Sequence, residues 1–230
     1  MLSIAENRSV SFGRGRGYAP PVYTFEIDAR SSGGVYVPRL FAAGDESLVG
    51  ARAVAVVGSR AASPEGRAFA AEVACALVRV GFVVMSGLAA GIDTAVHRAA
   101  IAAGGRTIAV IGTPLERAYP PENARLQEQI YSDHLLVSPF AEGTRTHRGH
   151  FPARNRVMAR LALATVVAEA QENSGTVHQV RESLACGRRV FVARQLLASC
   201  PWLNALADHA LFTTLAEAQF NVASIAAYLD

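Results

Sequence analysis

Ala53-Val-Ala-Val-Val-Gly-Ser-Arg60 is the stretch that decides the fold, because a short apolar run ends there in a Gly-Ser turn. The run is too short for an ordinary helix and is rich in β-branched residues, which is typical of a strand buried on both faces. Such a strand needs helices on both sides of its sheet. Similar runs follow at Phe82–Met85, Thr107–Ile111, Leu135–Val137, Ala164–Ala168 and Val190–Ala193.

Helical patterns separate these predicted strands. Ser63 is suited to cap the first helix with Pro64 at its first position, and Gly104-Gly105 is suited to end the second. The expected helices are Pro64–Val80, Ile92–Ala103, Pro121–Ile130, Pro152–Leu161 and Thr176–Cys186. Regular alternation of strand and helix predicts an α/β fold with a doubly wound, mostly parallel sheet.

The length and composition favour one main domain. The chain has 230 residues, of which 51% are hydrophobic and 18% charged, enough to bury one sizeable core. Residues 1–34 include Gly13-Arg-Gly-Arg-Gly17 and Ser31-Ser-Gly-Gly34, which indicate a flexible arm, although Val22–Ile27 is compatible with an edge strand. We therefore expect an arm at 1–34, the α/β domain at 35–212 and a helical tail at 213–230.

The basic residues are all arginine, and this excludes several enzyme classes. The chain has 22 basic residues, no lysine and a net charge of +3. Without lysine there is no Walker-type P-loop, no Schiff base and no lysine general base. The turn Gly58-Ser-Arg60 lacks the spaced glycines of a dinucleotide fingerprint, so we expect no cofactor. The serines of the glycine-rich turns lack the sequence context of a hydrolase nucleophile, so we identify no catalytic residue.

The cysteines predict neither a metal site nor disulfides. Cys75, Cys186 and Cys200 are odd in number and lack metal-ligand spacing. The N-terminal sequence has no signal pattern, and no apolar run reaches the roughly 20 residues of a membrane span. We expect a reduced cytoplasmic protein without zinc.

Three turns rich in Gly and Ser follow the predicted strands. They are Gly58–Arg60, Ser86–Asp93 and Glu169–Thr176. Each leads into a helix, where backbone N–H groups and the helix dipole favour an anion. A purely conformational role is the alternative for each turn. Asp93 and His97 lie one helical turn apart as a possible acid/base pair, but we favour an Asp that satisfies backbone amides.

A basic segment, Arg148-Gly-His-Phe-Pro-Ala-Arg-Asn-Arg156, contains the densest positive charge. No acid occurs between Glu142 and Glu169, so the local field favours phosphate. Phe151 lies among these arginines in the sequence and is suited to stack on an unpaired base. Taken alone, the segment is equally compatible with solvated arginines and a Phe151 that anchors a loop to the core.

Together these motifs closely resemble the DprA/Smf DNA-processing family over residues 36–212. The resemblance is carried by Val56–Arg60, Ser86–His97, Gly105–Gly112, Tyr119–Asn123, His150–Arg156 and Glu169–Thr176. It implies an extended Rossmann-like domain that binds single-stranded DNA, forms homodimers, loads a RecA-type recombinase during natural transformation and is not an enzyme. Phe191-Val-Ala-Arg-Gln195 departs from the family's Phe-Ala-Val-Pro-Gly, so we expect a truncated or divergent member.

The resemblance and the residue chemistry give one set of expected DNA-binding residues. Arg60 and Arg148 are expected to hold phosphates and Phe151 to stack on a base, while backbone amides and polar side chains add hydrogen bonds. The full set is Ser59, Arg60, Ser86, Gly87, Arg148, His150, Phe151, Arg154, Asn155, Arg156, Ser174 and Gly175. For Asn155 a helix cap, and for Arg156 an ion pair, are the alternatives.

Two other functions remain open from the sequence. One is a nucleotide-hydrolysing enzyme of the lonely-guy type, whose Pro-Gly-Gly-x-Gly-Thr phosphate loop is faintly echoed by Asn173-Ser-Gly-Thr176. The other is a nucleotide-sensing module with neither activity. The incomplete phosphate loop makes single-stranded DNA binding the leading hypothesis.

Overall fold

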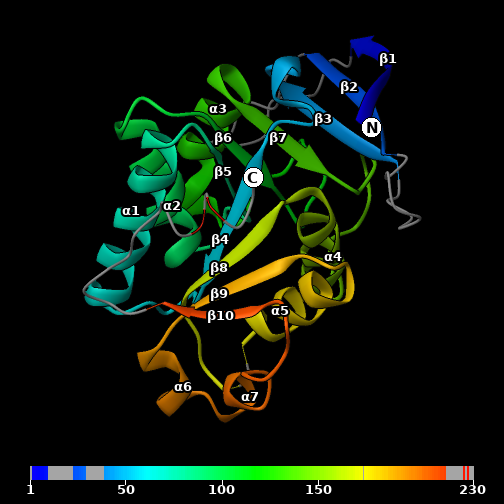
Figure 1. Ribbon diagram of the computed structural model, residues 1–230. Coiled ribbons are helices and arrows are strands. Elements are labelled where there is room, and N and C mark those ends of the chain that lie inside the picture. Colours follow the sequence, from blue (N-terminus) through cyan, green and yellow to red (C-terminus); the bar gives the residue numbers. More distant parts are fainter. Residues whose placement is uncertain are drawn as a thin grey trace.

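The computed structural model describes residues 2–9, 23–29, 39–172, 174–215, 225 and 227. One ten-stranded sheet runs through them in the order β1-β2-β3-β7-β6-β5-β4-β8-β9-β10 (Figure 1). The strands from β7 to β10 in that order are parallel, and β1, β2 and β3 join the β7 edge antiparallel. The predicted α/β class with a mostly parallel sheet is confirmed.

The six strands expected from the short apolar runs are all present. They are β4 (Ala53–Gly58), β5 (Val83–Ser86), β6 (Thr107–Val110), β7 (Leu135–Ser138), β8 (Ala164–Glu169) and β9 (Arg189–Ala193). In β4, Val54 and Val56 face one layer of helices, while Ala55 and Val57 face the other. Almost every residue of an inner strand is therefore buried on one side or the other, which explains the continuous apolar runs.

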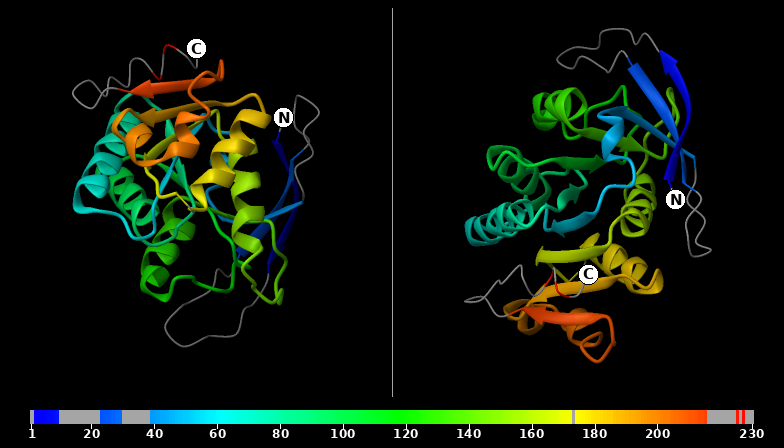
Figure 2. Two further views of the ribbon diagram at one scale, coloured as in Figure 1. Left: turned by 90° about the horizontal axis from the view of Figure 1, so that it is seen from below. Right: turned by 45° about the horizontal axis from the view of Figure 1, so that its top comes forward.

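Helices cover both faces of the sheet, as Figure 2 shows. The helices α1 (Pro64–Arg79), α2 (Ile92–Ala102) and α3 (Ala124–Asp133) pack on one face. On the other face lie α4 (His150–Leu161), α5 (Thr176–Ala185), α6 (Gln195–Ser199) and α7 (Pro201–Asn204). Two short 3-10 helices, η1 (Glu46–Leu48) and η2 (Pro121–Asn123), complete the set within these ranges. The expected helix at Pro121–Ile130 is thus η2 followed by α3.

The order of the strands places a crevice beside β4. From β4 the chain adds β5, β6 and β7 on one side, and then crosses to β8 on the other. The loops after β4 and β8 therefore leave the sheet toward opposite faces, and a crevice opens between them. Gly58–Arg60 and Glu169–Thr176 are the two segments that border it.

The interpretation of residues 1–34 as a flexible arm is wrong for two segments. β1 (Leu2–Ser9) and β2 (Tyr23–Ala29) form an antiparallel pair that continues through β3 (Leu40–Gly44) to β7. β2 includes residues 23–27 of the proposed edge strand Val22–Ile27, but it is not itself at the edge. The repeats at 13–17 and 31–34 lie outside the described residues. Backbone pairing of β1 with β2, and of β2 with β3, rather than apolar periodicity, accounts for these strands.

The expected helical tail at 213–230 also needs correction. β10 (Phe212–Leu215) pairs parallel with β9, so the sheet extends beyond the expected domain boundary. Phe212 and Leu215 are buried against opposite layers. Ile225 and Ala227 are helical, and residues 216–224, 226 and 228–230 lie outside the described part.

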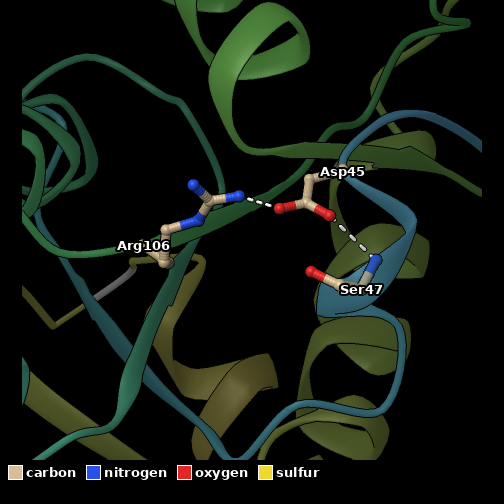
Figure 3. A network of polar contacts seen from close by, with 3 residues as sticks. All are labelled: Asp45, Ser47 and Arg106. Carbon is tan, nitrogen blue, oxygen red and sulfur yellow. Dashed lines mark hydrogen bonds and ion pairs between the residues drawn. The ribbon is translucent and has the colours of Figure 1, made fainter.

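A polar network lies at the amino ends of the parallel strands β6 and β7 (Figure 3). The Asp45 carboxylate forms an ion pair with Arg106 and accepts a hydrogen bond from the Ser47 N–H at 2.9 Å. The Asp45 N–H donates to the His134 carbonyl at 2.7 Å. Because Arg106 precedes β6 and His134 precedes β7, this network connects the antiparallel strands to the parallel ones at the edge opposite the crevice.

Candidate functional site

A cavity of about 630 Å³ occupies the crevice at the carboxyl ends of the strands. Its walls are the turn after β4, the loop that leads into α2, the segment before η2, the start of α4 and the first turn of α5. Segments far apart in the sequence meet here because each follows, or packs beside, the end of a parallel strand. Eight of the twelve residues predicted to bind DNA line it: Ser59, Arg60, Arg148, Phe151, Arg154, Asn155, Ser174 and Gly175.

An aromatic and basic surface forms one side of the cavity mouth. The guanidinium carbon of Arg60 lies 4.9 Å from the centre of the Phe151 ring. Tyr119 adds a second ring, whose centre is 5.3 Å from that of Phe151 with an angle of 46° between the planes. The Phe151 ring can approach β6 because Gly112 has no side chain: a Cβ there would lie 2.7 Å from Cδ1 of Phe151. The close approach of the Phe151 ring to Gly112 therefore fixes the position of the ring.

Polar groups on the remaining walls are available to a ligand. Arg148 is exposed beside the mouth, just before α4. The Ser59 backbone is fixed between Glu169 and Ile92, whereas its hydroxyl makes no hydrogen bond within the described ranges. Across the cavity, Asn155 Nδ2 donates to the Gly175 carbonyl at 3.2 Å and so connects α4 to the turn before α5.

Arg154 lies at the floor of the cavity and is only 3% exposed. Its Nη1 donates to the Val110 carbonyl at 2.6 Å, and its guanidinium lies against Gly87, where a Cβ would overlap it. Burial lowers the pKa of Arg154 to about 10, the Asp93 carboxylate opposes this shift, and Arg60 adds to it. Arg154, which is among the predicted DNA-binding residues, therefore lines the cavity as a buried cation of its floor.

Asp93 is the buried carboxylate beside Arg154. It is 6% exposed, lines the cavity and accepts a hydrogen bond from the Ala89 N–H at 3.3 Å. This contact matches the expectation that Asp93 satisfies a backbone amide. Burial raises the pKa of Asp93, while the nearby Arg154 acts in the opposite direction.

His97 does not form an acid/base pair with Asp93. The Thr107 hydroxyl donates to the Val84 carbonyl, so its oxygen accepts from Nδ1–H of His97 at 2.7 Å. Burial first, and then the charges of Arg154 and His134, lower the pKa of His97 to about 3. The imidazole is therefore a neutral part of the core between α2 and the sheet.

Four of the predicted DNA-binding residues do not line the cavity. Ser86 is buried and donates its hydroxyl to the Val56 carbonyl at 2.7 Å, while the neighbouring Gly87 contacts the Arg154 guanidinium. His150 is 6% exposed and stacks on Phe140 at 3.7 Å between ring centres. Arg156 is exposed on α4 but lies outside the cavity wall.

Several lining residues escaped the prediction. Tyr119 is 48% exposed at the mouth, and its position in the Tyr119-Pro-Pro-Glu-Asn123 motif was an available signal. Thr176, His178 and Gln179 line the cavity from the first turn of α5. Thr176 ends the Gly/Ser-rich turn Glu169–Thr176, which was an available signal. The sequence at His178 and Gln179 has no unusual charge or glycine pattern, so only the packing of α5 beside α4 reveals these two residues.

Glu169 ends β8 but does not line the cavity. Its carboxylate accepts hydrogen bonds from the Ser63 N–H at 3.0 Å and the Ser63 hydroxyl at 2.5 Å. The same hydroxyl caps α1 by accepting from the Gly66 N–H. Glu169 thus connects the end of β8 to the start of α1 and stabilises that helix terminus.

The described ranges contain neither a metal centre nor a membrane span. No group of three or more His, Cys, Asp or Glu side chains there has the arrangement of a metal site. None of the helices in those ranges combines the length and apolar character of a membrane span.

The chain matches the family model of DNA recombination-mediator protein A over residues 32–227. It is 46% identical to DNA processing protein DprA of Streptococcus pneumoniae over 152 residues, which are 66% of this chain and 54% of that protein. It is 37% identical to DprA of Bacillus subtilis over 153 residues, 66% of this chain and 52% of that protein. The chain thus spans about half the length of these curated relatives.

Solved structures agree with the fold. The crystal structure of Streptococcus pneumoniae DprA has a TM-score of 0.72 and 40% identity, covering 80% of this chain and 65% of that one. A Helicobacter pylori DprA structure that concerns single-stranded DNA binding has a TM-score of 0.73 at 22% identity, with 99% and 95% coverage. A molybdenum cofactor carrier protein from Chlamydomonas reinhardtii has a TM-score of 0.56 at 17% identity, with 78% and 98% coverage. At such identities the last two show the fold alone.

Proposed function

The chain belongs to the DNA recombination-mediator protein A family, and on this premise we propose that it binds single-stranded DNA in the cavity at the carboxyl ends of β4 and β8. On this proposal the protein binds single-stranded DNA during recombination and does not act as an enzyme. The contact between Arg60 and Phe151 carries the proposal, because it joins a cation and an aromatic ring at the mouth of one cavity.

The mouth supplies the two interactions that an unpaired strand requires. Arg60 and Arg148 come from different loops, so they are able to hold different phosphates of one strand. Phe151 and Tyr119 present ring surface in the same cavity, and a base stacks on such a ring only when it is not paired. A duplex would offer its phosphates but not its bases. We therefore expect a clear preference for single strands.

The position of Glu169 supports a binding role over nucleotide hydrolysis. A glycosidic hydrolase of the lonely-guy type needs a carboxylate at its phosphate-binding cavity. Glu169 instead accepts two hydrogen bonds from Ser63 and lies outside the cavity wall.

Membership of the family also supports two protein partners. We propose that a RecA-type recombinase and a second copy of this chain assemble with it in the cytoplasm. The proposal is tested by sedimentation of the protein alone and by the rate at which the recombinase forms filaments on covered single-stranded DNA. An unchanged rate of filament formation would contradict the proposal that the recombinase is a partner.

The central experiment is a titration of the protein with labelled single-stranded and duplex oligonucleotides at several salt concentrations. We expect tighter binding of the single strand and a log affinity that falls by roughly 0.7 per neutralised phosphate for each log unit of salt. Equal affinity for the duplex, or an affinity independent of salt, would refute the proposal. Incubation with nucleoside monophosphates in parallel should release no free base.

A further inference from the structure

The loop of residues 139–149, here called the Arg148 loop, carries one cation of the cavity mouth. It connects β7 to α4 and contains no helix or strand. Arg148 lies near its end, is exposed and lines the cavity. On an unrestrained loop this side chain would take many positions, and a phosphate that binds it would have to order the loop at a cost in entropy. Contacts that order the loop beforehand therefore belong to the site.

Three rings meet where the Arg148 loop joins α4. The His150 ring stacks on the Phe140 ring, with 3.7 Å between the ring centres and 6° between the planes. The His147 ring lies 3.9 Å from the same imidazole, centre to centre, at an angle of 60°. Phe140 is near the start of the loop and His147 near its end. One side chain of α4 thus contacts both ends of the loop.

Hydrogen bonds hold the middle and the end of the same loop. The Gly143 N–H donates to the Glu116 carboxylate at 2.8 Å. The Gly149 N–H donates to Nδ1 of His147 at 3.2 Å, which fixes the orientation of the His147 ring. Arg148 lies between His147 and Gly149, so its backbone is fixed on both sides.

His150 is itself fixed by the segment that follows β6. It is only 6% exposed, and its Nδ1 has no hydrogen-bond partner within the part of the chain that the structure describes. The ring hydrogen-bonds to the Gly112 backbone, so Nε2 carries the proton and donates to the carbonyl. Burial first, and then the charge of His147, lower the pKa of His150. The imidazole that stacks on Phe140 is therefore neutral.

We propose that His150 is a positioning residue of the DNA site, and that its ring holds the Arg148 loop so that Arg148 lies at the cavity mouth. This inference rests on the proposed binding of single-stranded DNA, and it adds how one cation of that site is placed. In this role His150 acts through Arg148 and makes no hydrogen bond to DNA, in contrast to the role predicted from the sequence.

The central test is a double-mutant cycle of His150→Ala and Arg148→Ala, with the affinity for a labelled oligo-deoxythymidine strand measured at three salt concentrations. His150→Ala should bind roughly three- to tenfold more weakly, because the loop then places Arg148 at the mouth for only a fraction of the time. Arg148→Ala should flatten the salt slope by roughly 0.7 in the wild type and by much less in the His150→Ala background. Equal effects in the two backgrounds would overturn the proposal.

Two further substitutions separate the stacking of the rings from other roles of His150. His150→Phe keeps a ring for Phe140 and His147 to contact, so it should recover most of the affinity that His150→Ala loses. If it binds as weakly as His150→Ala, the imidazole nitrogens matter rather than the stack, and the proposal is wrong. Phe140→Ala removes the stack from the side of the loop, leaves α4 unchanged and lies outside the cavity wall. It should reproduce the loss, and normal binding by this variant would contradict the proposal even where His150→Ala does not fold.

Arg145→Ala is the matched control, because Arg145 is exposed on the same loop but lies outside the cavity wall. It should change the affinity by the same factor with and without the His150 ring. Thermal melting of each variant confirms the fold. A wild type that binds no single strand would remove the proposed function itself, whereas a wild type that binds, with an additive cycle, would remove only the positioning role.

Discussion

The Arg60 guanidinium lies over the face of the Phe151 ring, 4.9 Å from its centre, although the two residues belong to different elements of the fold. Arg60 follows β4, and Phe151 is in the first turn of α4. This contact orients the guanidinium before any ligand arrives and covers part of the ring. A base that stacks on Phe151 must therefore share the ring with Arg60 or approach from the side of Tyr119.

Replacing Arg148 should change the electrostatic part of binding. In Arg148→Ala one cation of the mouth is lost, so the affinity for single-stranded DNA falls and the salt slope becomes shallower by roughly 0.7. Arg148 is exposed, so the melting temperature should stay close to that of the wild type. Affinity measured at three salt concentrations gives the slope, and an unaltered slope would place Arg148 outside the bound strand.

Replacing Phe151 should change the stacking part of binding. Phe151→Ala should cost about 1–3 kcal/mol of binding free energy with almost no effect on the salt slope. Because the ring is half-buried against Gly112, some loss of stability accompanies the change, but less than the roughly 3–5 kcal/mol of a fully buried Phe. A variant that melts much lower yet binds DNA normally would make Phe151 a core residue.

Removing the buried cation at the floor should destabilise the fold. In Arg154→Met the Val110 carbonyl loses its donor and Asp93 loses the nearby positive charge. The free energy of unfolding should fall by about 3 kcal/mol, the lower end of the range for removing one partner of a buried charged pair. The double variant Arg154→Met with Asp93→Asn should recover part of it, since no uncompensated carboxylate remains. Denaturant unfolding of the two single variants and the double variant measures this coupling; strictly additive losses would contradict it.

Glu169→Gln tests the helix cap and the enzymatic alternative together. The amide retains one acceptor but loses the charge at the start of α1, so stability should fall by about 1 kcal/mol. Single-stranded DNA affinity should remain, because Glu169 lies outside the cavity wall. Release of free base from nucleoside monophosphates by the wild type, abolished in this variant, would instead support the hydrolase.

Stability should depend on pH through His97. Its pKa is about 3 in the folded protein, against the ordinary 6.5 when unfolded, so between these values the unfolded chain binds the extra proton. Its contribution to stability is complete above pH 6.5 and declines as the pH falls toward 3, by up to about 1.4 kcal/mol per pH unit. His97→Gln should flatten the curve of unfolding free energy between pH 6.5 and 4 relative to the wild type. Parallel curves would contradict the buried neutral imidazole.

The sequence predicted the parallel part of the sheet well, because each inner strand is a continuous apolar run such as Ala53–Val57. β1, β2 and β10 carry no such run, and they form by pairing along the sheet, which no local pattern reveals. The start of α1 was predicted from Ser63 and Pro64, and the end of α2 from Gly104-Gly105, whereas α6 and α7 were not predicted.

The structure brings eight of the twelve predicted DNA-binding residues together at one cavity, and the other four lie outside its wall. Along α4, His150, Arg154 and Met158 recur every four residues and so share the buried face of the helix. Phe151 and Asn155 lie on the adjacent face, toward the cavity. Residue type alone suggested that every polar side chain of this segment contacts DNA. The helical period, applied to the segment, would have removed His150.

The pairing of β4 with β8, at Val54 opposite Ala164, has a consequence for the order in which the protein matures on the ribosome. β4 leaves the ribosome early, but its second neighbour and the far wall of the cavity, Ser174 to Gln179, are synthesised much later. Contacts so distant along the chain form slowly, since a long loop must close first. A nascent chain that has completed only β4 to β7 holds an unpaired central strand edge, and it cannot yet hold DNA.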